Sequence, residues 1–166
     1  PDNTSQYEMC YPNFEVKNSF LRSVIRLFIG YDEPVSEYLN DLKQALDSQD
    51  MKQFVSVLQT IFAAIPYELE ATVKRAPKGK GYESHYHTVI YAILKVTGMQ
   101  VSAEERTNRG RIDLVAESPK SIYIFEMKVD KPAKEALEQI KQKGYAEKYR
   151  LAHKKIFLVG LSFSSK

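Results

Sequence analysis

The sequence is poor in cysteine and in long apolar runs, and each scarcity excludes a class of protein. The one cysteine among 166 residues, Cys10, excludes an intrachain disulfide and a cysteine-rich zinc site. The most continuous apolar run, 156–160, has the length of a strand, whereas a membrane-spanning helix needs about 20 such residues. No basic segment followed by an apolar one marks a signal peptide. These absences predict a protein without a membrane anchor, with the cytoplasm as the default location.

Net charge is also small, because 24 Lys and Arg are offset by 21 Asp and Glu to give +3. A mildly basic chain permits nucleic-acid binding without requiring it. Hydrophobic residues make up 43% and charged residues 27%, a balance typical of a folded globular protein. The chain starts at Pro1 within a polar stretch, which predicts that it is part of a longer protein.

Apolar residues recur at helical spacing in the first part of the chain, so we predict four helices there. The second and third carry apolar stripes that are typical of the core-facing sides of an antiparallel helix pair. The limits expected from caps and breakers are Phe14 to Gly30, Pro34 to about Leu46, Ser48 or Asp50 to Pro66, and roughly Tyr82 to Val96 with Gly98 as C-terminal cap.

After Gly98 the apolar period changes from 3.6 to 2, which predicts strands at about 99–107, 111–117 and 121–129. Helical spacing returns over 133–149. The last segment, 155–163, is nearly continuously apolar and therefore predicts a buried central strand. We expect residues 1–66 to form a helical extension or linker region, and residues 67–166 to form an α/β domain of order α-β-β-β-α-β.

Three charged side chains, Asp113, Glu126 and Lys128, interrupt the second and third predicted strands. Charge buried in a sheet is costly unless it is paired or binds a metal. Antiparallel strands folded about the turn at 118–121 pair residues whose numbers sum to about 239. Asp113 then lies opposite Glu126, and Arg111 lies opposite Lys128. Asp113, Glu126 and Lys128 share one face of the sheet. The residues expected to point the other way, into the core, are Ile112, Leu114, Tyr123, Phe125 and Met127.

The two carboxylates of this hairpin suggest a metal site. Cross-strand neighbours have Cβ atoms about 5 Å apart, so Asp113 and Glu126 repel each other unless a cation lies between them. Oxygen ligands favour Mg²⁺ or Mn²⁺. The Lys128 ammonium, two residues along the strand, is placed to orient or help deprotonate a water that attacks phosphorus.

Asp113 followed by Glu126-x-Lys128 resembles the signature of the PD-(D/E)XK nuclease superfamily, and the predicted element order is similar to that family's core. Segments 107–113, 123–128 and 136–145 further resemble the nuclease-like C-terminal domain of bacterial proteins that carry an AAA-ATPase-like N-terminal domain. Segment 11–16 resembles the junction in such proteins. The resemblance covers about residues 80–163. It implies a restriction-endonuclease-like α/β fold, a mixed sheet flanked by helices, preceded by the helical extension.

The resemblance implies roles for residues of both strands. Asp113 and Glu126 match the metal ligands, with the backbone carbonyl of Met127 as a third ligand, and Lys128 matches the residue that acts on the water. The proline that precedes the aspartate in many members is replaced here by Ile112.

Two flanking helices carry further matches. Glu83 matches the extra acidic residue that many members place beside the metal, and Gln139 matches a position that supports the site or contacts substrate. Some relatives place a tyrosine four residues after this glutamine. Here that position holds Lys143, and Tyr145 is two residues further on. We expect Lys143 and Tyr145 to contact nucleic acid.

Basic residues around the hairpin give the remaining prediction of a substrate surface. Arg109 and Arg111 stand beside the predicted site and are expected to bind phosphates, although scattered basic residues are usually ordinary surface. The loop at 78–81, Lys-Gly-Lys-Gly, lacks the spacing of a phosphate-binding P-loop. His85 and His87, two apart on a helix, face away from each other and make a poor zinc pair.

The predicted function is Mg²⁺- or Mn²⁺-dependent hydrolysis of phosphodiester bonds, with DNA favoured over RNA. The alternative is a non-catalytic module that binds nucleic acid or protein and serves an ATPase-like partner domain. A structural adaptor is a third reading. In the plainest reading the strand charges form only a salt-bridge cluster, Glu83 pairs with His87 on the surface, and Gln139 is merely solvated. Many proteins of the resembled family act as dimers, so a homodimer is a further expectation from the resemblance.

Overall fold

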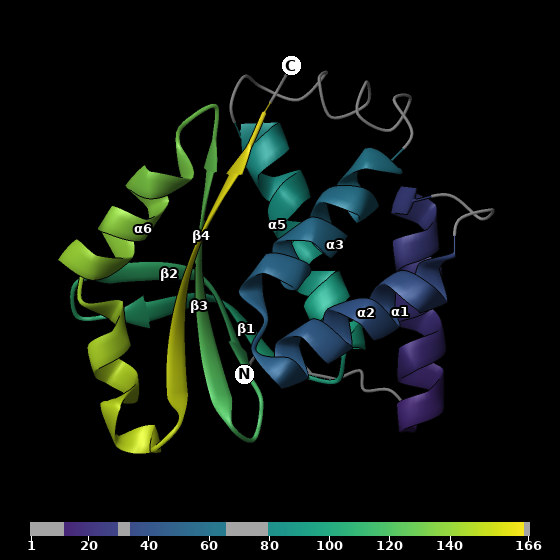
Figure 1. Ribbon diagram of the computed structural model, residues 1–166, viewed down its shortest axis with the longest axis horizontal. Helices are drawn as coiled ribbons and strands as arrows, with labels where there is room; N and C mark the ends of the chain where they lie inside the picture. Colours follow the sequence, from purple (N-terminus) through teal and green to yellow (C-terminus); the bar gives the residue numbers. More distant parts are fainter. Residues whose placement is uncertain (1–11, 30–33, 66–79, 165–166) are drawn as a thin grey trace, which may run out of the picture.

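The computed structural model describes residues 12–29, 34–65 and 80–164 of the chain, which form helices around a four-stranded sheet (Figure 1). No helix within these described residues is long and apolar enough to cross a membrane. The elements are α1 (Phe14–Ile29), α2 (Val35–Ser48), α3 (Met51–Ala63), α5 (Lys80–Val96), β1 (Gln100–Thr107), β2 (Gly110–Glu117), β3 (Ser121–Val129), α6 (Ala133–Gln142), the 3₁₀ helix η1 (Tyr145–Ala152) and β4 (Lys155–Phe163).

The sheet is mixed, with spatial order β1-β2-β3-β4. β1, β2 and β3 form an antiparallel meander, and β4 runs parallel to β3 after the α6 crossover. The prediction that 155–163 is a central strand was wrong, because β4 pairs only with β3 and lies at the edge of the described sheet. Its apolar run instead reflects two covered faces. Phe157 packs with the core on one side of the sheet, while Ile156 and Leu158 pack with a second cluster on the other.

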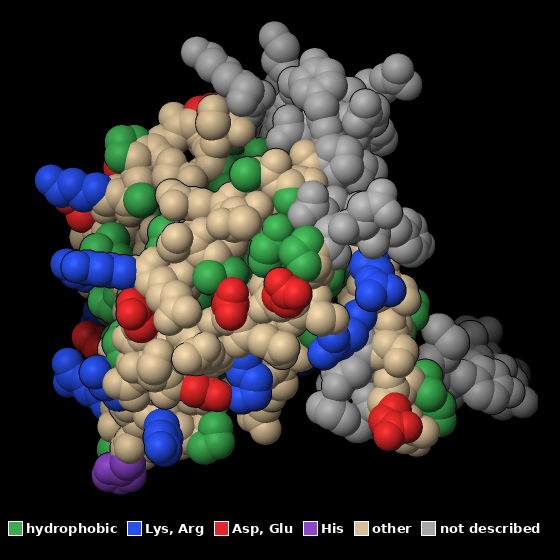
Figure 2. Space-filling model, turned by 45° about the vertical axis from the view of Figure 1, so that its right-hand side comes forward, with side chains coloured by type: hydrophobic (Ala, Val, Ile, Leu, Met, Phe, Trp, Pro, Cys, Tyr) green, Lys and Arg blue, Asp and Glu red, His purple; other side chains and the backbone are tan. Residues whose placement is uncertain are grey.

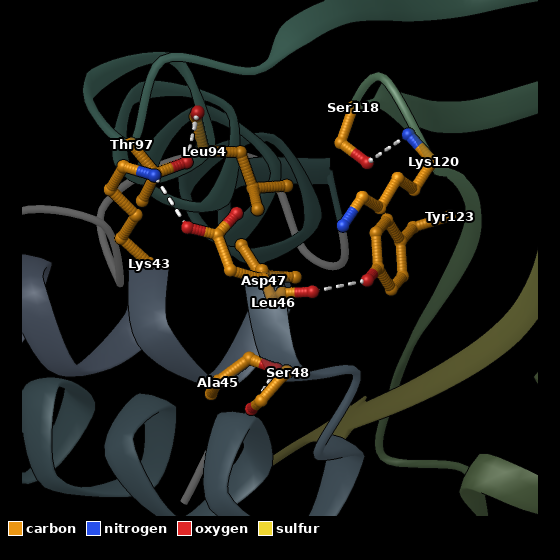
Figure 3. Close-up of polar contacts among 10 residues, drawn as sticks. All are labelled: Lys43, Ala45, Leu46, Asp47, Ser48, Leu94, Thr97, Ser118, Lys120 and Tyr123. Atoms are coloured by element: carbon orange, nitrogen blue, oxygen red, sulfur yellow. Dashed lines mark hydrogen bonds and ion pairs between the residues drawn. The ribbon is translucent and has the colours of Figure 1, made fainter.

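One face of the sheet is covered by α2, α3 and α5, with α1 packed on the outer side of this helical layer, and the other face is covered by α6 and η1 (Figure 1). The helical layer and the sheet share one core, in which the Phe54 ring of α3 lies 6.0 Å from that of Phe125 on β3. The Tyr123 hydroxyl, on the same strand, donates to the Leu46 carbonyl of α2 at 2.8 Å (Figure 3). Because both contacts are buried, the predicted helix pair is an integral layer of the fold.

The junction between α2 and α3 shows how the sequence sets helix limits. Asp50 is the N-cap of α3, and its carboxylate accepts from the backbone N–H groups of Lys52 and Gln53. Gln49 closes α2 in the left-handed conformation, at φ 61°. Of the two caps predicted, Asp50 is therefore confirmed. The predicted breakers Gly30 and Pro66 lie outside the described residues.

The predicted helix over 133–149 is two helices. α6 ends at Gln142, and Gly144, at φ 59°, turns the chain into the 3₁₀ helix η1. Helical spacing of apolar residues continues across this break, which is why the sequence pattern hid it. The turn brings Tyr145 and Tyr149 of η1 down onto the sheet, beside Ile140.

Candidate active site

The site begins where β2 and β3 part. Their ladder includes Leu114–Phe125 and three further pairs that all sum to 239, which confirms the predicted register. It stops one residue short of Asp113. There the Asp113 carboxylate takes over the pairing, because its Oδ2 accepts from the Met127 N–H at 2.8 Å. We call this point, formed by Asp113, Glu126 and Met127, the strand fork.

The β1 side is irregular at the same level. The β1–β2 ladder passes from Ala103–Leu114 to Glu105–Ile112 and omits Glu104 and Asp113. Glu104 has a φ of 53°, a left-handed conformation that interrupts regular pairing. At this level β2 also changes face, because Ile112 packs with the α6–η1 cluster while Leu114 packs with the helical layer. The prediction that these two side chains share a face was wrong.

The predicted pairing of Arg111 with Lys128 also fails, because the β2–β3 ladder has ended before these residues. Arg111 instead pairs with Arg106 of β1, and its Nη1 lies 3.3 Å from Glu104 Oε1. Lys128 turns toward Glu126, with its Nζ 3.0 Å from Oε1. The lysine is therefore within the site, and the arginine is on its rim.

Glu126 is the most constrained charge of the site, with only 2% of its surface exposed. Its Oε1 accepts from Lys128 and from the Gln139 side-chain amide of α6. Its Oε2 is buried without a hydrogen-bond partner among the described residues. Burial, followed by the charge of Asp113, raises the pKa of Glu126 to about 7, although Lys128 opposes the shift and Glu83 adds to it.

Gln139 reaches Glu126 because α6 lies very close to the sheet. Glu126 pairs with Gly160 on β4, and a Cβ at Gly160 would lie 2.5 Å from the Ala133 carbonyl of α6. Only glycine permits that approach. The packing contact and the amide contact thus arise from the same feature of the sequence.

α5 forms the other wall of the site. Together, Glu83 and Asp113 line a polar hollow of about 280 Å³, which also includes Ser84, His87, Glu104 and Arg111. His87 approaches β2 most closely, with its Nε2 2.7 Å from the Asp113 carbonyl oxygen. A carbonyl only accepts, so Nε2 carries the proton. No Glu83–His87 ion pair occurs among the described residues, where His87 is bound to the strand.

The residues at the fork suit a divalent cation in two respects. Asp113 and Glu126 are oxygen donors that repel each other, and Glu126 Oε2 has no partner within the described part of the chain. Glu83 is less closely placed. Across residues 12–29, 34–65 and 80–164, no three His, Cys, Asp or Glu side chains converge enough to hold a metal. The two strand carboxylates would therefore be the core of such a site.

The predicted substrate-binding residues divide into a surface group and a buried one. Arg109, Arg111 and Lys143 are exposed, and Arg109 Nη1 lies 3.7 Å from Glu147 Oε1. Tyr145 is only 2% exposed, and its hydroxyl donates to the Arg111 carbonyl at 2.8 Å. Burial raises the pKa of Tyr145, and the nearby charges of Glu126 and Asp113 add to that effect. The tyrosine thus lies behind the site.

Basic side chains continue beyond the hairpin onto the neighbouring helices. In Figure 2, Lys and Arg side chains project along the edge of the molecule on which α6 and η1 lie. The exposed basic residues of these elements and of the turn between them are Lys134, Lys141, Lys143, Lys148 and Arg150. Two of them, Lys141 and Lys143, follow Gln139 by two and four residues in the chain.

The sequence analysis missed two contacts of the fork, those of His87 and Tyr145 with strand carbonyls. His87 follows Glu83 by four residues, so the two were expected on one helix face. No pattern in the chain shows which atom His87 reaches, because that depends on how α5 docks on the sheet.

A mixed sheet covered by helices on both faces, with two acids and a lysine at a strand fork, defines a restriction-endonuclease-like α/β domain. A family model for the PD-(D/E)XK nuclease superfamily matches residues 81–166. The chain belongs to this superfamily, and its domain is nuclease-like.

Other comparisons add a longer relative. The chain is 33% identical over 161 residues to a protein of Azotobacter chroococcum mcd 1 named "Uncharacterized protein in vnfD 5'region". The alignment covers 96% of this chain and 30% of that relative, so the chain spans about a third of its length. No solved structure matches the chain.

Proposed function

We propose that the protein hydrolyses phosphodiester bonds in nucleic acid, with DNA as the favoured substrate and Mg²⁺ or Mn²⁺ as cofactor. The observation that carries the proposal is the strand fork, where the Asp113 carboxylate is fixed on the Met127 N–H, its charge raises the pKa of Glu126, and the buried Glu126 Oε2 has no partner among the described residues. Retaining two repelling carboxylates costs stability, and a cation is the plainest reason to retain them.

Asp113 and Glu126 would hold the ion, with the Met127 carbonyl and Glu83 as additional ligands. A bound ion would supply charge stabilisation at phosphorus and lower the pKa of a water molecule. The side chains of Lys128 and Gln139 would position the water and the Glu126 carboxylate. Lys128, whose Nζ is held 3.0 Å from Glu126 Oε1, would orient the attacking water and help to deprotonate it. Gln139 fixes the rotamer of Glu126 from α6.

Around this site, Arg109, Arg111 and Lys143 would contact the phosphate backbone, which needs charge and no base-specific geometry. Tyr145 supports these contacts from the interior. The wider architecture is proposed as well: residues 67–166 as the nuclease unit with a helical extension before it, an ATPase-like domain elsewhere in the full-length bacterial protein, a homodimer, and a cytoplasmic location. The greater length of the Azotobacter relative is compatible with further domains.

Cleavage assays test the proposal directly. Plasmid, single-stranded DNA and RNA are incubated with the protein in Mg²⁺, Mn²⁺ or EDTA. Wild type should cut with Mg²⁺ or Mn²⁺ present and should not cut in EDTA. Lys128→Ala should lose at least about 100-fold in rate while Mn²⁺ affinity, measured by calorimetry, persists. Lys120→Ala, which removes an exposed lysine at the other end of the β2–β3 hairpin, is the control.

Native-rate cutting by Lys128→Ala would contradict the proposal. Binding of DNA without cutting by wild type would favour the non-catalytic module.

A further inference from the structure

Two backbone carbonyls of β2 beyond the β2–β3 ladder accept hydrogen bonds from side chains. The Asp113 carbonyl receives His87 Nε2 at 2.7 Å, and the Arg111 carbonyl receives the Tyr145 hydroxyl at 2.8 Å. The ladder itself ends at Leu114–Phe125. Arg111 and Ile112 stay paired to β1, but the β1–β2 ladder omits Asp113. Where pairing to β3 has stopped, the segment is thus held by β1 on one side and by these two side chains.

The two donors reach β2 from opposite layers. His87 belongs to α5, whose apolar residues pack into the core of the helical layer. Tyr145 belongs to η1 and packs with Ile112 and Ile140 in the cluster on the other face. Each of these helices supplies a donor for only one of the two carbonyls. Both bonds are partly buried, so leaving either carbonyl without a partner costs stability.

The sequence leaves room for the tyrosine contact. Gly110 precedes Arg111 at φ 148°, and a Cβ built on it would lie 3.0 Å from the Tyr145 hydroxyl oxygen. A side chain there would push the hydroxyl from the strand. On the α5 side the imidazole bonds through Nε2, its outer nitrogen, so the contact needs a donor at the end of a side chain of that length.

We propose that His87 and Tyr145 are positioning residues, which hold residues 111–113 from both faces so that the Asp113 carboxylate keeps its bond to the Met127 N–H and faces Glu126. The catalytic consequence rests on the proposed function; the positioning itself does not. Neither residue touches the reacting atoms in this assignment. Both act through Asp113.

The Met127 amide reports on this positioning without any assay of activity, because its partner is Asp113 Oδ2. Its hydrogen exchange is measured by NMR in EDTA, relative to the ladder amides of 122–125. His87→Leu and Tyr145→Phe each remove a donor with little change of volume. Each should speed exchange at Met127 about tenfold, since one hydrogen bond of about 1.4 kcal/mol is lost from the segment. The ladder amides should change far less.

Two variants serve as controls. His87→Gln restores a terminal N–H donor and should exchange within about twofold of wild type. Tyr149→Phe removes a buried hydroxyl from the same 3₁₀ helix, one without a hydrogen-bond partner among the described residues, and should leave Met127 unchanged. If Met127 in His87→Leu and Tyr145→Phe exchanges as in wild type, or only as much faster as the ladder amides, the proposal is wrong. It is equally wrong if His87→Gln behaves like His87→Leu.

Cleavage by the same variants separates the two proposals. With an active wild type, His87→Leu and Tyr145→Phe should lower kcat about tenfold and leave KM within about twofold, because phosphate contacts are untouched. Recovery in His87→Gln supports positioning through the donor. An inactive wild type with faster Met127 exchange in the two variants contradicts the proposed function and supports the positioning role.

Discussion

Glu126 is the residue whose environment departs most from that of a surface carboxylate. Its pKa is about 7 in the folded chain, against 4.5 for an ordinary glutamate, chiefly because of burial and then because of Asp113. Below pH 4.5 both states hold the proton, so the shift has no effect on stability. Between pH 4.5 and 7 the folded chain keeps the proton that the unfolded chain has released. The free energy of unfolding therefore falls as pH rises through this window.

Replacing Glu126 with Gln should remove this pH dependence. The shift corresponds to about 3 kcal/mol, so the free energy of unfolding of Glu126→Gln, relative to wild type, should rise by about that amount between pH 4.5 and 7.5. Urea denaturation in EDTA at half-unit steps measures it. Glu138→Gln, on the exposed side of α6, is the control and should track wild type. Parallel pH curves for wild type and Glu126→Gln would mean that the carboxyl is not raised.

A substitution of Asp113, the other carboxylate of the strand fork, gives a second test of the proposed metal site. Asp113→Asn keeps an oxygen for the Met127 N–H but removes a charge beside Glu126, so the metal-free protein should be as stable as wild type or more so. Wild type should gain about 2.7 kcal/mol at Mn²⁺ concentrations 100 times the dissociation constant, and the variant much less. Thermal melts at matched ionic strength compare them. A destabilised variant beside a wild type indifferent to Mn²⁺ would instead indicate a simple salt-bridge cluster.

The residue-level geometry was only partly predictable. The short turn at 118–121 fixes which residues of β2 and β3 face each other, so the pairs up to Leu114–Phe125 followed from counting. The predicted Asp113–Glu126 pair lies beyond the ladder, where Asp113 bonds the Met127 N–H instead. The use of a single Glu126 oxygen by both Lys128 and Gln139 did not follow. It depends on the depth to which α6 settles on the sheet, which the sequence shows only as one glycine in β4.

At the scale of elements, the β1–β2 hairpin carries the cations proposed to bind phosphate. Arg109 and Arg111 form ion pairs with Glu147 and Glu104, but all four side chains are more than half exposed. Such exposed pairs contribute little to stability, so both arginines can exchange partners for phosphate groups. The hairpin also closes one side of the site through the contact of Tyr145 with the Arg111 carbonyl.

Replacing both arginines with Gln should weaken DNA binding without regard to sequence. Fluorescence anisotropy in EDTA, at salt concentrations from about 50 to 200 mM, gives the affinity and its salt dependence. Each lost phosphate contact should flatten the log–log slope by about 0.9, so the double variant should lose up to about 1.8. Lys43→Gln with Lys120→Gln, two exposed lysines on α2 and the β2–β3 turn, is the matched control. An unchanged affinity in the arginine variant would remove the hairpin from the substrate surface.

Element boundaries were predictable where a cap or a turn residue sets them, and unpredictable where packing does. Asp50 caps α3 through its own side chain, so its role is readable in the chain. Gly144 ends α6 within an apolar pattern that continues into η1, and the pattern alone indicates one helix. The edge position of β4 was also not predicted, because an apolar run indicates that both faces of a strand are covered and not how many strands lie beside it.

At the scale of the whole molecule, the family match and the core have different limits. The superfamily model covers 81–166, but the core that contains β3 also includes buried residues of α1, α2 and α3. Phe54 and Leu42 are completely buried, and Phe125 meets Phe54 across the layers. The sheet face opposite α6 therefore depends on helices that precede the matched segment. This dependence argues that the helical extension is required for the nuclease fold.

Two measurements test that dependence. Phe54→Ala should cost about 3–5 kcal/mol of unfolding free energy, because it opens a cavity against Phe125. Val55→Ala, the next residue of the same helix and 36% exposed, should cost less than about 1 kcal/mol. The fragment 67–166 should lack a cooperative thermal transition and near-ultraviolet circular dichroism, since Tyr123, Phe125 and Met127 lose the layer that buries them. A fragment that melts cooperatively, together with similar costs for the two substitutions, would show instead that 67–166 folds as an independent domain.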